Sequence, residues 1–451
     1  MFQLNGIILL EIYVRKMKKI KEKIFEVDNL IYVVLLIALI LRIIAMEQLT
    51  PSYNLGSDDM AFVESGILFR QNSTITMHYV ESAKNMPGMT FIVAFFLTVF
   101  GEMTTAFWIA IKLFWIAMGV ASIFGVYKII KLYANPVISS LLCLLFCIPD
   151  FVWLDNLILT ETPYMLCNIF LVYSSLKLAE TQKKRYFWFI VIWYILGLLI
   201  RPTLALYPII LFIYLVMKKY DWKLLIKQGA IAFGILLVIL VPWWYRNYKL
   251  FNEFIPLTYG TGDPLLLGTY QGTGYPSDDE LDYSEYLDQE SNEIKKYLGP
   301  DNEYTSKKQW AIFRDEENMA KFRIKKWWQS SKKSFIKSYF IIKPLGLIGG
   351  SFYWKEIFGV SHNAILILRR IDLVICALCL ITALFLRKRL KEIVFIGLAY
   401  LYQIALYSYT FSFDRYGQVL IFFRYIIIGW MIYEIYQKIK NKKGKVEVEN
   451  E

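Results

Sequence analysis

Ten apolar runs, separated by short polar segments, constrain the fold of this 451-residue chain more than any other feature. A backbone inside a bilayer must satisfy its own hydrogen bonds, so each run is expected to form a helix. Several runs are shorter than the roughly 18 residues of a bilayer crossing, so their helices must extend into flanking polar sequence. The predicted fold class is therefore an all-α, polytopic membrane protein. The runs lie near residues 28–46, 104–132, 136–150, 161–179, 186–201, 203–217, 223–242, 364–386, 392–411 and 417–436.

Basic clusters between the runs predict how the helices are oriented. Lysine and arginine in short loops favour the cytoplasmic side of a membrane, and ten spans place every cluster there, with both termini inside. The formal charge of +12 is therefore assigned to loops that face anionic lipid, and nucleic acid is not an expected partner. The clusters are Arg15–Lys23, Lys128 with Lys131, Lys183–Arg185, Lys218 with Lys219, Arg387–Lys391 and Lys438–Lys445.

The segment GMTFIVAFFLTVFG at 88–101 does not fit this pattern as a further span. As an eleventh span it would invert every later loop, and it is short for a crossing. An interfacial or re-entrant helix suits its length better. The expected number of spans is therefore ten or eleven, with interfacial helices in the first external loop.

The same topology divides the chain into parts. Two segments are external, and in the second of them Trp327 and Trp328 beside lysines predict a helix that lies on the membrane surface. No cleavable signal peptide is visible, and both Met1 and Met17 fit as the start of translation. The parts are a basic cytoplasmic leader (1–27), an N-terminal transmembrane module (28–242) with the first external loop (47–87), a second external loop (243–362), C-terminal transmembrane helices (363–437) and a cytoplasmic tail (438–451).

The cysteines and histidines give no sign of a metal centre. All five cysteines lie in apolar runs, and the CxxC of Cys376 and Cys379 has no second ligand pair, so packing is the preferred interpretation. The two histidines, His78 and His362, are too few for a histidine-built site. There is no GxGxxG or GxxxxGK[ST] motif. No cofactor is predicted, although two adjacent acids could hold Mg²⁺ or Mn²⁺.

Acidic residues near outer helix ends are the candidate catalytic groups. Asp58 and Asp59 follow Gly56 in SYNLGSDDMAFVESGILF, where partial desolvation and mutual repulsion raise carboxylate pKa values. Such an acid suits a general base for an acceptor hydroxyl or amine, and helix capping is the structural alternative. Glu161 in LTETPYML begins a span, where a carboxylate is costly without a partner or a role. Asp155 is a weaker candidate nearby.

Cationic and polar residues lie at the same outer level as these acids. The planar guanidinium group suits phosphate oxygens, so outer arginines opposite outer acids indicate a site for a phosphorylated lipid beside an acceptor. For each arginine, contact with lipid headgroups is the alternative, and Arg42 and Lys112 are assigned to such contacts. The candidate phosphate-binding residues are Arg201, Arg246, Asn247, Arg415 and Tyr416.

These motifs, in this order, resemble the GT-C fold glycosyltransferases of the protein mannosyltransferase and aminoarabinose transferase type. The resemblance implies Asp58 as the base, Asp59 as its partner, Glu161 as a later acid, and the phosphate-binding candidates near a lipid phosphate. Phe62 stands where the family usually has Tyr, and the RY motif lacks its usual proline-rich continuation. The resemblance runs from about residue 30 to residue 436 through SDDMAF, MPGMTFIVAFFLTVFG, LTETPYML, LLIRPTLAL, PWWYRNYKLFNEFIPL and DRYGQVLIFF.

The implied function is transfer of a sugar from a polyprenyl-phosphate-linked donor to an unidentified acceptor on the outer face of the cell membrane. No cytoplasmic loop is large enough for a nucleotide-sugar domain, which also favours a lipid-linked donor. A polysaccharide polymerase or ligase, a lipid-linked glycan transporter and a structural membrane protein remain the alternatives. A transporter would require charges at mid-membrane depth along a polar path.

Overall fold

The computed structural model describes residues 29–299 and 303–449. The predicted leader (1–27), with its basic cluster and both possible start sites, lies outside these residues. Within them, every apolar run forms helix, which confirms the all-α membrane fold. The corresponding helices are α2 (Leu30–Leu49), α5 (Thr105–Ile130), α6 (Pro136–Cys143) with η1 (Leu144–Cys147), α8 (Glu161–Thr181), α9 (Lys184–Ile200), η2 (Pro202–Leu204) with α10 (Tyr207–Met217), α11 (Trp222–Phe251), α18 (His362–Leu386), α19 (Leu390–Tyr409) and α21 (Ile421–Glu449).

Five of the described helices are long and apolar enough to cross a membrane. They are α2, α5, α11, α19 and the stretch Asp414–Asn441, which joins α20 (Asp414–Gln418) to α21. α9 and α10 have fewer than 18 residues, and α18 carries the charges of Arg369, Arg370 and Asp372. The number of spans, ten or eleven, therefore stays a prediction.

Polar residues in the turns determine where several helices begin. The side chains of Thr104, Asn135, Asp221 and Ser361 each accept a hydrogen bond from a backbone N–H three residues later, at 3.1, 2.8, 2.6 and 3.3 Å. Such caps satisfy backbone donors that have no partner inside the helix. They start α5, α6, α11 and α18, respectively.

Segment 88–101 forms α4 (Gly88–Phe100), a 13-residue helix. At 1.5 Å per residue it is about 20 Å long, which is shorter than the roughly 30 Å apolar thickness of a bilayer. It packs closely against the bundle, because a Cβ added at Gly88 would lie 2.6 Å from the carbonyl oxygen of Leu199. It also packs against α3 (Asp58–Asn72), where Gly66 leaves room for the side chain of Val93.

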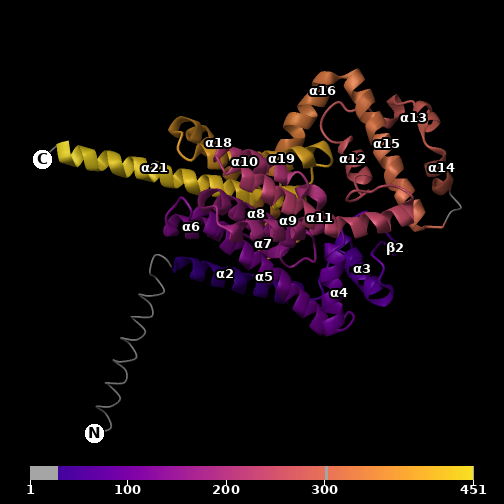
Figure 1. Ribbon diagram of the computed structural model, residues 1–451, viewed down its shortest axis with the longest axis horizontal. Helices are drawn as coiled ribbons and strands as arrows, with labels where there is room; N and C mark the ends of the chain where they lie inside the picture. Colours follow the sequence, from indigo (N-terminus) through magenta and orange to yellow (C-terminus); the bar gives the residue numbers. More distant parts are fainter. Residues whose placement is uncertain (1–28, 300–302, 450–451) are drawn as a thin grey trace, which may run out of the picture.

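The last long helix is central to the bundle, whereas α11 lies at its edge. In their most apolar windows, 78% of the residues of Asp414–Asn441 are buried, against 11% for α11. In Figure 1, the start of α2 and the far end of α21 both lie toward the left, and α3, α4 and α12 to α16 lie toward the right. We call the right-hand end, formed by residues 50–101, 252–299 and 303–361, the loop end.

The loop end contains a small hairpin and a helical subdomain. In the hairpin, β1 (Thr76–Met77) pairs antiparallel with β2 (Val80–Glu81). The subdomain contains α12 (Gly262–Gly268), η3 (Asp278–Glu280), α13 (Ser284–Gln289), α14 (Asn292–Leu298), α15 (Ser306–Ser330), α16 (Lys332–Lys337), η4 (Ser338–Ile342) and α17 (Lys343–Gly349).

Trp327 itself cannot contact lipid, whereas the predicted surface position of the helix that carries Trp327 and Trp328 stays a prediction. Its side chain is fully buried, and its ring packs against those of Tyr275, Phe335 and Tyr339 at centroid distances of 6.0, 5.5 and 5.7 Å. Trp328, the next residue, is 41% exposed. The subdomain therefore has an aromatic core of its own, and Trp327 stabilises it.

Candidate active site

Two carboxylates and two guanidinium groups form a chain of ion pairs at the loop end. Arg415 Nη1 donates to Asp58 Oδ2 at 2.8 Å, and Arg415 Nε donates to Glu161 Oε1. Arg201 Nη2 donates to the same oxygen of Glu161. The four side chains come from α3, α8, the end of α9 and α20, so the bundle joins positions as far apart as 58 and 415. This ion-pair chain contains four of the residues proposed from the sequence.

Asp58 is the exposed end of the ion-pair chain. It is the first residue of α3, and its side chain is 40% exposed. Burial alone would raise the pKa of Asp58, but the charge and hydrogen bond of Arg415, with the charges of Lys84 and His78, lower that pKa below its ordinary value. Asp58 is therefore ionised at neutral pH. Its Oδ1 accepts no hydrogen bond from any described residue.

Asp59, the neighbouring acid, points into the protein. It is 1% exposed. Its Oδ2 accepts from the backbone N–H of Leu55 at 2.6 Å, and its Oδ1 accepts from those of Ser57 and Met60 at 3.2 and 2.9 Å. Asp59 thus fixes the loop before α3, and the two acids do not converge on one point. Across residues 29–299 and 303–449, no group of three His, Cys, Asp or Glu side chains could hold a metal ion.

Glu161, at the start of α8, is fully buried. A buried carboxylate is tolerated when charged donors surround it, and two guanidinium groups meet at its Oε1. Thr160 links the same groups, because its hydroxyl accepts from Arg201 Nε at 2.7 Å and lies 3.4 Å from Glu161 Oε2. Pro202 disfavours continuation of α9, so Arg201 lies at the helix end, where its side chain reaches α8.

α20 carries Arg415 and Tyr416 to the site. A Cβ added at Gly417 would lie 1.8 Å from the carbonyl oxygen of Leu347, so glycine allows α20 to approach α17 closely. The guanidinium carbon of Arg201 lies 5.1 Å from the centroid of the Tyr416 ring, within the range of a cation–π interaction. Tyr416 therefore contacts the arginine at the buried end of the ion-pair chain.

Arg246 and Asn247 make their contacts at the hairpin. Arg246 Nη1 donates to the carbonyl oxygen of Ser82 at 2.8 Å and to Asn247 Oδ1 at 2.9 Å, and its Nη2 donates to the carbonyl oxygen of Ile75 at 2.7 Å. These bonds tie α11 to the strands that carry the segment 76–81. The structure thus does not bring these two residues into the ion-pair chain.

Lys84 and His78 were not predicted as site residues, yet their charges act on Asp58. Lys84 Nζ lies 3.5 Å from His78 Nε2 and 5.0 Å from the centroid of the Phe313 ring. Burial, together with the charge of Lys84, lowers the pKa of His78. Two-residue strands leave no periodic pattern in a sequence, so the hairpin that places these residues could not be anticipated.

Arg42 and Lys112 do not contact lipid headgroups, and this prediction is wrong. Each is 1% exposed. Arg42 Nε pairs with Asp155 Oδ2 at 2.7 Å, and Lys112 Nζ donates to the carbonyl oxygens of Tyr53, at 2.7 Å, and of Asn156. The partners come from the loop before α3 and from the segment that follows α7 (Pro149–Leu154). These partners are far from Arg42 and Lys112 in the sequence, so no local pattern predicts the contacts.

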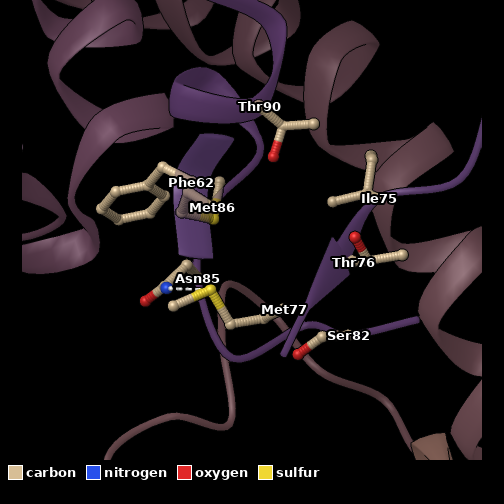
Figure 2. Close-up of a pocket in the computed structure, with 8 residues that line it drawn as sticks. All are labelled: Phe62, Ile75, Thr76, Met77, Ser82, Asn85, Met86 and Thr90. Atoms are coloured by element: carbon tan, nitrogen blue, oxygen red, sulfur yellow. Dashed lines mark hydrogen bonds between the residues drawn. The ribbon is translucent and has the colours of Figure 1, made fainter. Parts of the chain in front are cut away.

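A small cavity lies against Phe62, one helical turn after Asp58 on the same face of α3 (Figure 2). Its volume is about 10 Å³, enough for about one water molecule. The buried hydroxyl of Thr76 at its edge has no hydrogen-bond partner among the described residues, and Asn85 Nδ2 contacts Met77 Sδ at 3.5 Å. The cavity is too small to hold a sugar.

Comparison with known proteins adds a family match. The model of the family described as dolichyl-phosphate-mannose-protein mannosyltransferase matches residues 84–245. It confirms the resemblance for this part of the chain, which contains Glu161 and Arg201 but neither Asp58 nor Arg415. No curated protein matches the chain in sequence.

Two solved structures are similar to the chain, each with 12% identity over 90% of it. One is the crystal structure of ArnT from Cupriavidus metallidurans bound to undecaprenyl phosphate, of which 77% is covered with a TM-score of 0.41. The other is the same protein in the apo state, of which 76% is covered with a TM-score of 0.38.

Proposed function

We propose that the protein is a membrane glycosyltransferase of the GT-C type. It moves a sugar from a polyprenyl-phosphate-linked donor to an acceptor on the outer face of the cell membrane. The observation that carries this proposal is the ion-pair chain, which leaves Asp58 as an ionised and partly exposed carboxylate. The family match over residues 84–245 supports a lipid-phosphate sugar as the donor class.

In the proposed reaction, Asp58 Oδ1 accepts the proton of an acceptor hydroxyl or amine as that group attacks the anomeric carbon. The bond between the anomeric carbon and the phosphate oxygen breaks, and its electron pair leaves with the polyprenyl phosphate. Attack on the face opposite the leaving group inverts the configuration at this carbon. The products are the glycosylated acceptor, the lipid phosphate and a protonated Asp58, which returns its proton to water.

Arg415 and Lys84 are the groups that we assign to the leaving phosphate. Arg415 Nη2 donates to no described residue, and Lys84 forms no ion pair with a described carboxylate, so both have capacity for an anion. Negative charge grows on the phosphate in the transition state, where fixed cations stabilise it most. Arg201 is different, because its nitrogens already bind Thr160, Tyr407 and Glu161.

The test compares Asp58→Asn with two other carboxamide variants in purified protein supplied with polyprenyl-phosphate sugars and cell-envelope acceptors. We expect Asp58→Asn to lower transfer by roughly 10²–10⁴-fold with an unchanged melting temperature, because only the proton acceptor is lost. Asp59→Asn should lower the melting temperature, because Asp59 fixes the loop. The exposed Asp279 supplies the control, and Asp279→Asn should alter neither quantity. Near-wild-type transfer by Asp58→Asn would refute the assignment of the base.

A second candidate function, transport of a lipid-linked glycan, is favoured by buried charges elsewhere in the bundle. Arg369 binds both carboxylate oxygens of Asp150 and lies 3.4 Å from Asp372, which also pairs with Arg424. Transport would be supported if a labelled lipid-linked sugar crossed the membrane of sealed vesicles without any acceptor and if Asp150→Asn abolished this movement. Strict dependence of sugar turnover on an acceptor would support the transferase.

A further inference from the structure

Lys112 is buried where an ammonium group needs several acceptors. It lies on α5, is 1% exposed, and forms no ion pair with any described carboxylate. Its Nζ instead donates to two backbone carbonyl oxygens, those of Tyr53 and Asn156. Burial of a charge is costly unless it is hydrogen-bonded, so the two carbonyl groups are held firmly to this lysine.

The two carbonyl groups belong to the two segments that carry the acids of the site. Tyr53 precedes Asp58 by five positions, and Asn156 precedes Glu161 by five positions. On the other side, Arg415 binds both of these acids. The two segments are thus joined twice, through their backbones by Lys112 and through their carboxylates by Arg415.

Other contacts make each segment rigid between the carbonyl group that binds Lys112 and the carboxylate that binds Arg415. Asp59 binds three backbone N–H groups around the start of α3. In the second segment, Trp115 Nε1, one turn after Lys112 on α5, donates to the carbonyl oxygen of Leu159 at 3.0 Å. A movement at either carbonyl group is therefore transmitted to the acid that follows it.

We propose that Lys112 is a positioning residue for the transferase reaction, which fixes the separation of Asp58 and Glu161 and thereby the position of Asp58 against Arg415. The inference rests on the proposed function for its kinetic readout. Its geometric readout does not depend on any reaction. Lys112 lies under the site and contacts no substrate in this proposal.

The kinetic test compares Lys112→Met with Trp115→Phe as a matched control. Both variants remove hydrogen bonds between α5 and the segment before Glu161, but only the first also releases the loop before Asp58. Misplacement of a reacting group by about 1 Å can cost on the order of 10²-fold in rate. We expect Lys112→Met to lower kcat by roughly that factor with an almost unchanged KM for the donor. The acid limb of the kcat profile should move to higher pH, because Asp58 separates from Arg415 while Lys84 and His78 remain.

The geometric test uses spin labels at two exposed positions, Ser52 in the loop before Asp58 and Trp354. The Trp354 ring lies 6.0 Å from that of Phe413, two positions before Arg415, so the distance reports the loop against the element that carries Arg415. Lys112→Met should broaden the measured distance distribution, whereas Trp115→Phe should leave it narrow. An unchanged distribution in Lys112→Met would overturn the proposal whatever the activity. If Asp58→Asn remained active while Lys112→Met broadened the distribution, the proposed base would be wrong. The role of Lys112 in joining the two segments would still be supported. If Lys112→Met fails to fold, Lys112→Gln replaces it, because its amide nitrogen is one bond closer to the backbone than Nζ and is not expected to hold both carbonyl groups.

Discussion

At the scale of single residues, the contact between Asp58 and Arg415 determines how the exposed acid can act. One carboxylate oxygen is held at 2.8 Å by the guanidinium group. The other is open to a substrate. A carboxylate held in this way points in a fixed direction, which a flexible surface aspartate does not do. In the proposed reaction, the partner that lowers its basicity also stabilises the departing phosphate.

Replacing Arg415 should change the pH dependence of transfer. The pKa of Asp58 is lowered in the folded protein, so wild-type activity should persist as the pH falls through the ordinary range of aspartate near 4. In Arg415→Gln the acid limb should move to higher pH. The pair also stabilises the fold above the pKa of the unfolded chain, and this contribution is lost as the pH falls through the folded pKa. Rate and melting temperature against pH measure both effects.

Arg314→Gln is the control for this prediction, because Arg314 pairs with Glu253 and Glu317 inside the subdomain. It should leave the acid limb where it is in the wild type. An acid limb that does not move in Arg415→Gln would show that another group limits the rate at low pH.

Several site residues could be predicted from the sequence because they all stand at helix ends that the topology assigns to one side of the membrane. Asp58, Glu161, Arg201 and Arg415 were expected to share one depth, because depth is inferred from hydropathy and basic clusters. Depth says nothing of position around the bundle, so the same reasoning included Arg246, which contacts the hairpin instead. The partners of Arg42 and Lys112 depend on tertiary packing and left no local signal.

At the scale of elements, the contact between α5 and the segment after α7 depends on one glycine. Gly119 faces the carboxylate of Asp155, and a Cβ there would lie 2.0 Å from Oδ2. Asp155 cannot easily move, because Arg42 and Thr162 both bind it, each at 2.7 Å. The space left by Gly119 therefore holds a buried ion pair in place.

Gly119→Ala should destabilise the protein, although alanine favours helix over glycine. We expect a loss of roughly 1–3 kcal/mol from overpacking, measured by thermal unfolding in detergent. Gly234→Ala in α11 is the control, since nothing lies within 4 Å of a Cβ added there. It should be neutral or stabilising by up to about 1 kcal/mol. Equal effects of the two substitutions would mean that the packing around Asp155 is looser than described.

On α15, Glu316 should make stability depend on pH in the opposite sense to Asp58. Burial, with the charges of Asp263 and Asp315, raises the pKa of Glu316 to about 7. The folded state then binds more protons than the unfolded state between pH about 4.5 and 7, so stability falls as the pH rises through this window.

Glu316→Gln should therefore raise the melting temperature at pH 8.5 and leave it nearly unchanged at pH 4.5. The exposed variant Asp279→Asn should show no such difference. A gain of equal size at both pH values would point to packing, and not to the charge of Glu316, as its cause.

The helices of the bundle and α4 could be predicted element by element, and most helices after α11 in the loop end could not. Apolar runs and capping residues define the bundle helices, since lipid imposes helix on every apolar run. Segment 252–361 has no such constraint. Its lysine-flanked tryptophans are typical of a membrane-surface helix, but Trp327 instead fills an aromatic core. That core is assembled from Tyr275, Phe335 and Tyr339, whose proximity only the fold reveals.

At the scale of the whole molecule, the proposal requires the loop end to face outwards. The five cysteines lie in described helices, and none of them is exposed, so the wild type offers a low background for labelling. In intact cells, a membrane-impermeant maleimide should label Asp279→Cys at the loop end. It should not label Lys184→Cys in a basic cluster until the membrane is permeabilised. The reverse pattern would place the site on the cytoplasmic side and would contradict the proposed transfer on the outer face of the membrane.

The long sequence separations within the buried ion pairs have a consequence for biosynthesis. Glu161 binds Arg201, 40 residues later, and Arg415, 254 residues later. At 5–20 residues per second, translation of the longer interval takes roughly 10–50 s. During that time Arg201 is the counter-ion that the nascent chain can offer to Glu161. Asp150 has no such early partner in this network, because Arg369 is made 219 residues after it, whereas Arg201 follows Glu161 by 40 residues. The carboxylate of Asp150 therefore lacks this ion pair until α18 has been synthesised.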